Sequence, residues 1–298
     1  MPYKKPGKEF KLVDALLLFL TIAPIIVAIL FKVLFIPAKD GLEITGAFIF
    51  FTIPMPFSEL PITESQINSW AVIIAIAFLS LFMTHGIRAK VYTKRTVLAE
   101  WAVEKVEGLV KENMGENFMG FSPFIGAILL LSGFSSLSSL VGLFAPTSDL
   151  NIVAGWALMV FILITYYKFK AGPLYYIKGL FEPIPVLLPI NILGEFATPV
   201  AMTLRHYGNI LSGSVISVLV ASALQGLTSM VLGSAPGFFG QFPWFGVGIP
   251  AVLSIYFDLF SGCLQAFIFS MLTMMYVSTA FPAEELMRRN KMKTNSNN

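Results

Sequence analysis

Apolar runs, separated by charged, glycine-rich or proline-rich segments, follow one another along the chain. A membrane-spanning helix needs about 20 predominantly apolar residues. We predict membrane crossings at residues 13–37, 70–85, 121–144, 152–167, 188–232 and 249–281. The pattern therefore predicts an all-α polytopic membrane protein with about six membrane helices, the last two forming a long, steeply tilted hairpin.

The run at 188–232 is too long for one ordinary span. From Asn191 to Leu232 a straight helix would rise roughly 63 Å, about twice the ~30 Å thickness of the hydrocarbon core of a bilayer. The run must therefore tilt steeply or break into two spans. One tilted helix leaves all but three of the 20 Lys and Arg residues on the cytoplasmic side, which the positive-inside rule favours. The exceptions are Lys32, Lys39 and Arg205.

These spans and the charges between them divide the chain into five parts. Residues 1–37 form a cytoplasmic N-terminus and a first membrane helix, and residues 38–69 form an outer loop. Residues 70–187 hold membrane helices two to four together with a cytoplasmic amphipathic helix. Residues 188–281 form the tilted hairpin, and residues 282–298 form a cytoplasmic tail.

The amphipathic helix is predicted between residues 96 and 112, where the periodicity changes. One face carries apolar residues at helical spacing and another face carries glutamates. The apolar positions are Leu98, Ala102, Val106 and Leu109. This helix is expected to lie on the cytoplasmic membrane surface or against a soluble partner, and the membrane surface is the favoured interpretation.

Composition excludes several classes of protein. With 56% hydrophobic and 12% charged residues and a mean hydropathy of +0.78, the chain is no soluble domain, and we expect no nucleic-acid partner. His85 and His206 are its two histidines and Cys263 is its one cysteine, so the sequence has neither a zinc-protease motif nor a cysteine-rich metal site. We expect no metal, no cofactor and no catalytic chemistry on this chain itself.

Polar residues are aligned along both predicted helices of the hairpin. The first helix holds an arginine and a glutamate in an apolar run, where ionisable groups usually line a pathway or face a partner. At about 100° per residue its polar residues form one stripe, namely Asn191, Glu195, Thr198, Arg205, Asn209 and Ser212. The last helix has a second stripe, namely Asp258, Ser261, Gln265 and Tyr276.

The two stripes are predicted to meet at one seam. Two antiparallel helices that turn near residue 235 pair positions whose numbers add up to about 470. The predicted pairs are Arg205 with Gln265, Asn209 with Ser261, and Ser214 with Asp258.

Three motifs in this hairpin resemble subunit a of the F-type ATP synthase, the membrane stator that conducts ions past the rotating c-ring. The resemblance has motif strength over about residues 185–281 and continues more loosely back to about residue 60. The motifs are LPINIL at 188–193, Pro199 followed by LRHYGN at 204–209, and QAFIF at 265–269 with Leu272 and Tyr276.

By this resemblance, Arg205 is the stator arginine that faces the ion-carrying carboxylate of the c-ring, and Gln265 and Asn209 are its polar neighbours. The chain would conduct H⁺ or Na⁺ through two offset half-channels, while other subunits carry out the ATP chemistry. The implied partners are the c-ring, the b subunits of the peripheral stalk and the lipid bilayer. The implied location is the plasma (inner) membrane of a bacterium.

The chain departs from the family pattern near the expected channels. His206-Tyr207 stands where Leu-Phe is usual, which is expected to change the packing of a neighbouring face. Asn191 occupies a site where many members have glutamate, and Glu195, one turn later, resembles the acidic placement in chloroplast-like members.

A second departure concerns the outer half-channel. Ser214 replaces a frequent glutamate or histidine, and we expect Asp258 on the facing helix to supply the acidic group instead. The complete predicted ion pathway consists of Arg205 together with Asn191, Glu195, His206, Asn209, Ser214, Asp258, Ser261, Gln265 and Tyr276.

Other interpretations of these residues stay open at this point. Amides such as Asn209 and Gln265 also serve as ordinary hydrogen-bonding groups between membrane helices. His206 is expected to be packed or hydrogen-bonded more than to transfer protons, and Glu195 or Asp258 could be solvated groups near a helix end. The alternative function is an ion-coupled secondary transporter, which would also bury Arg and Glu on its helices.

Overall fold

The computed structural model of the protein describes residues 8–36, 46–56, 59–88, 93–181, 184–232, 248–249, 252–253 and 255–280. Within these ranges, six helices are long and apolar enough to cross a membrane. The predicted all-α polytopic fold is therefore confirmed.

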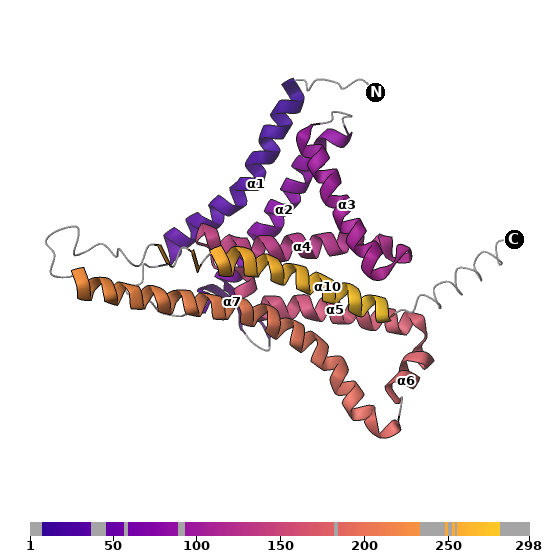
Figure 1. Ribbon diagram of the computed structural model, residues 1–298. Coiled ribbons are helices and arrows are strands. Elements are labelled where there is room, and N and C mark those ends of the chain that lie inside the picture. Colours follow the sequence, from indigo (N-terminus) through magenta and orange to yellow (C-terminus); the bar gives the residue numbers. More distant parts are fainter. Residues whose placement is uncertain are drawn as a thin grey trace.

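The helices form two groups that cross each other (Figure 1). The longer ones are α1 (Lys8–Phe35), α2 (Glu64–Arg88), α3 (Lys94–Met114), α4 (Ser122–Leu137), α5 (Leu150–Ala171), α6 (Pro173–Phe181), α7 (Leu188–Leu232) and α10 (Gly262–Ala280). α1 packs along α2, while α4, α5, α7 and α10 pack against one another in the second group. α3 leads from the end of α2 back to α4 and α10.

Short helical turns join these elements. Four are 3₁₀ helices, namely η1 (Glu116–Phe121), η2 (Ser138–Val141), η3 (Pro146–Ser148) and η4 (Pro185–Leu187). The element before α10 is different, because η5 (Ile255–Ser261) is a π-helix. π-helical turns inside longer helices are rare and often lie at functional sites.

α7 is a single helix of 45 residues, as the sequence predicted. At 1.5 Å per residue it is about 67 Å long, so it crosses the bilayer only at a steep tilt. Pro199 lies inside it and removes one backbone hydrogen bond, which permits the curvature visible in Figure 1. The predicted turn near residue 235 lies outside the described residues.

The segment predicted as an outer loop contains regular structure. Strand β1 (Ile49–Pro54) pairs antiparallel with β2 (Glu59–Thr63), and α2 begins directly afterwards at Glu64, six residues before the predicted span. Phe50 packs its ring against Phe31 and Phe35 of α1, so the hairpin is held at the end of that helix. The two strands have only six and five residues, so their alternating pattern does not stand out in the sequence beside the long apolar runs.

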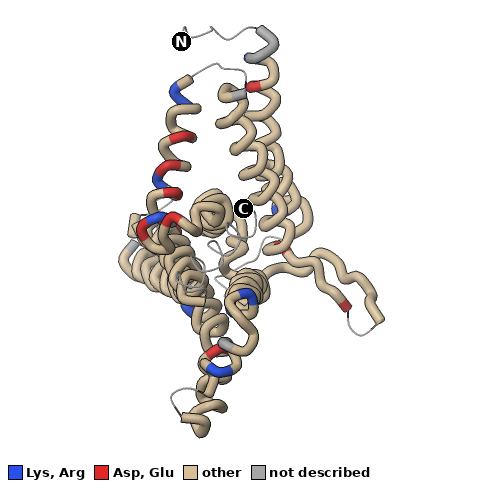
Figure 2. Tube along the Cα trace, turned by 90° about the vertical axis from the view of Figure 1, so that its right-hand side faces the viewer, with Lys and Arg blue, Asp and Glu red and all other residues tan. Residues whose placement is uncertain are grey.

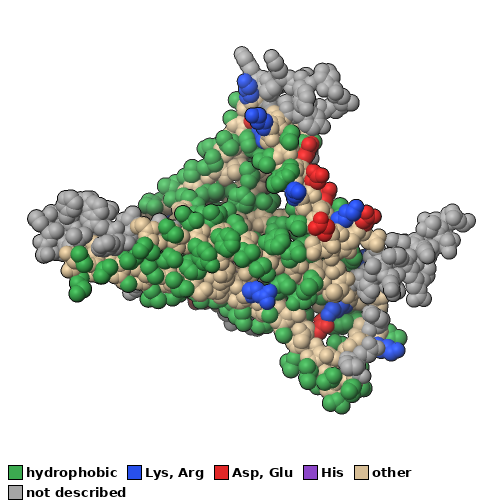
Figure 3. Space-filling view, in the orientation of Figure 1, with side chains coloured by type: hydrophobic (Ala, Val, Ile, Leu, Met, Phe, Trp, Pro, Cys, Tyr) green, Lys and Arg blue, Asp and Glu red, His purple; other side chains and the backbone are tan. Residues whose placement is uncertain are grey.

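The apolar core lies between α3, α4, α5 and α10. Its innermost side chains are almost completely buried, namely Val110, Ile125, Val160, Phe269 and Val277. Elsewhere large apolar side chains are exposed over most of the helical surface, and Figure 3 shows them covering the middle of the molecule. Such a surface is suited to lipid. The bilayer core contains no water, so apolar side chains exposed to it carry no hydrophobic cost.

Charged side chains gather at one margin of the molecule, on the right of Figure 3. α3 carries many of them, and Figure 2 shows Lys, Arg, Asp and Glu positions distributed along it. Val106 and Leu109 of α3 pack against the core, whereas Leu98 and Trp101 are exposed. Exposed apolar side chains beside charged ones are typical of a helix at a membrane surface.

Candidate functional site

α7 presents two different faces to its surroundings. Met202, His206 and Ile210 are buried against the other helices, at a spacing of four residues. Val200, Leu204 and Arg205 are exposed on the other side. Arg205 is one of only two charged residues in α7, and it lies on the face that the other described residues leave uncovered. The guanidinium group is therefore displayed toward a partner or the membrane and not toward the core.

The seam between α7 and the last helix has the predicted register. Asn209 donates a hydrogen bond from Nδ2 to Ser261 Oγ at 2.7 Å, and Ser261 Oγ donates to Asn209 Oδ1 at 2.9 Å. One turn away, the ring of Phe257 lies so close to Gly213 that a Cβ atom there would be 2.8 Å from it. The predicted pairing of Asn209 with Ser261 is confirmed.

Gln265 is the predicted partner of Arg205 on the last helix. It lies one turn beyond Ser261 on α10 and is 4% exposed. The register that joins Asn209 to Ser261 therefore brings Gln265 to the level of Arg205, on the buried side of the seam.

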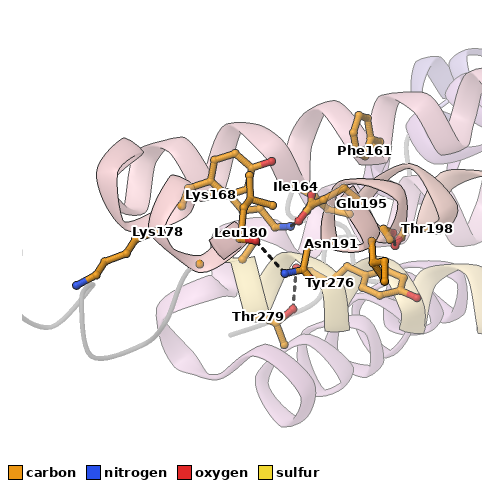
Figure 4. Close-up of a pocket in the computed structure, with 15 residues that line it drawn as sticks. Phe161, Ile164, Lys168, Lys178, Leu180, Asn191, Glu195, Thr198, Tyr276 and Thr279 are labelled. Carbon is orange, nitrogen blue, oxygen red and sulfur yellow. Dashed lines mark hydrogen bonds and ion pairs between the residues drawn. The ribbon is translucent and has the colours of Figure 1, made fainter. Parts of the chain in front are cut away.

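A cavity of about 790 Å³ lies beyond the α6 end of this seam, between α5, α6, α7 and α10. It brings together three predicted pathway residues, Asn191, Glu195 and Tyr276, and adds Thr198 of the same stripe. Figure 4 shows these side chains around one space, with Tyr276 reaching it from α10. The cavity is therefore lined by groups that can hydrogen-bond water or a hydrated ion.

Glu195 forms an ion pair inside this cavity with Lys168 from the last turn of α5. The Lys168 ammonium also lies 5.5 Å from the centre of the Tyr176 ring. The pKa of Tyr176 is raised, first by burial and then by the negative charge of Glu195. Asn191 donates a hydrogen bond to the Leu180 carbonyl at 2.8 Å, which joins α7 to α6 at the same cavity.

Lys168 was not among the predicted pathway residues. Its place near the end of an apolar run marked it as a cytoplasmic charge, and the sequence separation of 27 residues hid its partner. The signal that could have found it is the short α5–α6–α7 connection. Only the nine-residue helix α6 and the short η4 lie between α5 and α7, and α5 packs against α7.

A second polar group lies at the opposite end of the seam. Asp258 of η5 is half-buried, and the Ser139 hydroxyl of η2 lies within hydrogen-bonding reach of its carboxylate. Ser136 Oγ is 3.4 Å from Thr147 Oγ1, and Gly262 packs directly on Ser136. The Ser139 hydroxyl is thus the one beside Asp258, while Ser136 and Thr147 lie about one turn further along the last helix, at Gly262.

Ser214, which the sequence pairs with Asp258, lies on the exposed side of α7. Its hydroxyl donates to the Leu211 carbonyl of the same helix at 2.8 Å. Gly213 and Phe257, which directly precede Ser214 and Asp258 in the sequence, are in contact. Ser214 and Asp258 therefore lie at the same level of the hairpin.

His206 occupies the core. It is completely buried, its Nε2 atom is 3.4 Å from Ser132 Oγ, and its ring meets Trp156 and Phe269 edge to face. These contacts come from α4, α5 and α10, which agrees with the expectation of a packed residue. The side chain is directed away from the face that carries Arg205.

Comparison with known proteins identifies the family. Residues 67–278 match the family model described as ATP synthase A chain. The sodium-ion-specific ATP synthase subunit a of Propionigenium modestum is 31% identical over 234 residues, covering 73% of this chain and 73% of the relative. ATP synthase subunit a of Priestia megaterium is 36% identical, covering 74% of this chain and 93% of the relative. A Legionella pneumophila subunit a is 26% identical over 229 residues. The chain therefore belongs to the family of ATP synthase a subunits.

Proposed function

We propose that Arg205 of this stator subunit faces the ion-carrying carboxylate of the c-ring and separates two half-channels. The observation that carries this proposal is the exposure of Arg205 on the uncovered face of α7, in a helix that has only one other charged residue. A charge at such a place in a membrane is costly unless a partner compensates it. As an a subunit with six candidate spans, the protein is a multi-pass protein of the bacterial plasma membrane.

The chemistry of arginine suits this role. Guanidinium stays protonated at every relevant pH, so Arg205 acts as a fixed positive charge and not as a proton carrier. A ring carboxylate that turns from lipid toward Arg205 is stabilised in its charged form, and it releases its ion. The same positive charge repels cations that would move straight along the seam. Ion flow then requires rotation of the ring.

Polar groups on both sides of Arg205 support the two half-channels. The inner path consists of the cavity with Asn191, Glu195 and Tyr276, about 15 Å before Arg205 along α7. The outer path consists of Asp258 and the hydroxyl groups near it, with Ser214 at the same level. Asn209, Ser261 and Gln265 line the seam between the two paths and hold its register.

The partners and the ion follow from this role. The c-ring is the partner that Arg205 requires, and we further propose contacts with the b subunits of the peripheral stalk and with lipid. The coupling ion is H⁺ or Na⁺, since the ion-binding carboxylate belongs to the ring. ATP-driven pumping into vesicles, measured with and without Na⁺ in the presence of a protonophore, distinguishes the two ions.

The decisive test is substitution of Arg205. Arg205→Ala should lower ATP synthesis at least 100-fold while the c-ring and the soluble ATPase subunits still co-purify with the subunit. Arg205→Lys should fail as well, because an ammonium group can lose its proton in a dry seam and lacks the planar donor fork. Lys105→Ala, at an exposed basic residue of α3, is the matched control and should retain synthesis. Normal coupled synthesis in either arginine variant would refute the proposal.

A further inference from the structure

We infer that Lys168 is a further residue of the inner half-channel, where it neutralises Glu195 and thereby limits how readily cations enter the cavity. This inference rests on the proposed ion-conducting function and adds a residue and a control of ion entry to it. It concerns the charge balance of the cavity, which no single lining residue determines.

The geometry makes the pair the central charge of the cavity. Lys168 and Glu195 both line the space, and Figure 4 shows their side chains directed toward each other. The side chains are 24% and 19% exposed, so each is accessible from the cavity but largely shielded elsewhere. Lys178 also belongs to the lining, yet Figure 4 shows it directed outward. Among the described residues that line the cavity, Lys168 and Glu195 therefore determine the charge that an entering ion meets.

A tethered ammonium group competes with any mobile cation for the same carboxylate. While Lys168 holds Glu195, the pair has no net charge, and a proton or Na⁺ gains little by approaching it. The Tyr176 ring beneath the ammonium group helps to hold it, because an aromatic face attracts a cation. The Glu195 carboxylate is thus already paired with a cationic group of the protein itself.

Removing either charge should change ion entry in opposite directions. Without the ammonium group, the free carboxylate gives the cavity a negative charge and concentrates cations. Without the carboxylate, the remaining ammonium group repels them. In a narrow, partly desolvated space one unit charge changes the local cation concentration by roughly three- to tenfold. Removing both charges restores neutrality.

The test measures passive flux of the coupling ion, H⁺ or Na⁺ as the pumping assay identifies it, in vesicles that carry the membrane sector, stripped of the soluble ATPase and driven by a potassium diffusion potential. Lys168→Gln should raise the flux about threefold or more, and Glu195→Gln should lower it by a similar factor. The double variant should return to within about twofold of the unaltered protein. Both single effects should shrink at high ionic strength, since salt screens the charges.

Two controls make the result specific. Lys170→Gln changes the same charge two residues away on α5, outside the cavity lining, and should leave the flux unchanged. The exchanged pair, Lys168→Glu with Glu195→Lys, keeps neutrality with the charges reversed and should conduct within about twofold of the unaltered protein. Co-purification of the c-ring verifies assembly of each variant.

Several outcomes would overturn the inference. Equal loss of flux in both single variants, or unchanged flux in both, would show that the charge balance does not control entry. Assembly of the exchanged pair combined with failure of both single variants to assemble would show that the ion pair only joins α5 to α7. The proposed function is tested separately, because Arg205→Ala should abolish coupling whatever the Lys168 variants do.

Discussion

At the scale of single residues, two neighbours on α7 have opposite surroundings. Arg205 is exposed, whereas His206 is completely buried among Ser132, Trp156 and Phe269. Because each step along an α-helix rotates the side chain by about 100°, adjacent residues can serve different purposes. His206 helps to hold α7 against three other helices, and this attachment fixes the Arg205 face relative to α4, α5 and α10.

Asp258 provides the first prediction at this scale. Its carboxylate is half-buried beside the Ser139 hydroxyl, and Ser214 lies at the same level of the hairpin. Asp258→Asn should slow ATP-driven pumping several-fold, because the proposed outer path would lose a carboxylate that concentrates cations. Adding Ser214→Glu to this variant should restore part of the rate, since a carboxylate then enters the same region from α7. Vesicle pumping assays measure both effects.

The double variant separates a role in conduction from a role in folding. Ser214→Glu alone serves as its control, and its rate should stay above that of Asp258→Asn. Unchanged pumping in Asp258→Asn would show that this carboxylate is not on the path. If Asp258→Asn is slow and the double variant is no faster, the carboxylate acts only from its own position on η5.

At the scale of elements, two glycines allow the last helix to lie close to its neighbours. A Cβ atom on Gly213 would be 2.8 Å from the Phe257 ring, and one on Gly262 would be 2.7 Å from Ser136 Cβ. Contacts this short require the backbones to separate. Glycine at both positions therefore permits η5 and α10 to pack against α7 on one side and α4 on the other.

Gly213→Val should push η5 away from α7 and disturb the Asn209–Ser261 hydrogen bonds one turn away. We expect a loss of at least tenfold in coupled ATP synthesis, together with a lower yield of assembled complex. Gly226→Ala is the control, because no other part of the described structure lies within 4 Å of the added Cβ there and alanine favours the helix by about 1 kcal/mol. Equal rates in Gly213→Val and Gly226→Ala would contradict the proposed close packing.

The long elements could be predicted from the sequence and the irregular ones could not. The apolar run at 188–232 coincides with α7, and the pairing rule for the hairpin correctly joined Asn209 to Ser261. Both follow from helical periodicity and antiparallel geometry. The π-helix η5 lies within the apolar run at 249–281, which predicts one regular helix, so the sequence pattern contains no signal for it.

The site residues that could be predicted are those whose type differs from the residues around them in the sequence. Arg205 and Glu195 stand out as charges in an apolar run, whereas Lys168 resembles any basic residue at the end of a span. The packed state of His206 agrees with the expectation from the sequence, but the helices that cover it could not be identified from the sequence. In a membrane the outer face of a helix is as apolar as its packed face, so periodicity does not reveal which residues face the core.

At the scale of the whole molecule, the polar regions lie on both sides of Arg205 and at different depths. The cavity with Glu195 lies between α5, α6 and the first turns of α7, and Asp258 of η5 lies beside Ser139 of η2 at the opposite end of the seam. About 25 Å of α7 separates their levels, estimated from the helical rise. Because α7 is steeply tilted, this distance along its axis corresponds to a smaller difference in depth, with the two regions on opposite sides of Arg205.

The same distribution of charge predicts the orientation of the protein. α3 carries many charged groups at one margin, and the β1–β2 hairpin lies at the opposite end of α1 and α2, so the α3 margin should face the cytoplasm. In a background with Cys263→Ala, Thr52→Cys should react with an impermeant thiol reagent added to spheroplasts. Lys105→Cys should react only after the membrane is opened. Cysteines at positions 3 and 295, which lie outside the described residues, should behave like position 105. Labelling of position 105 in sealed spheroplasts would reverse the assignment of the inner and outer paths.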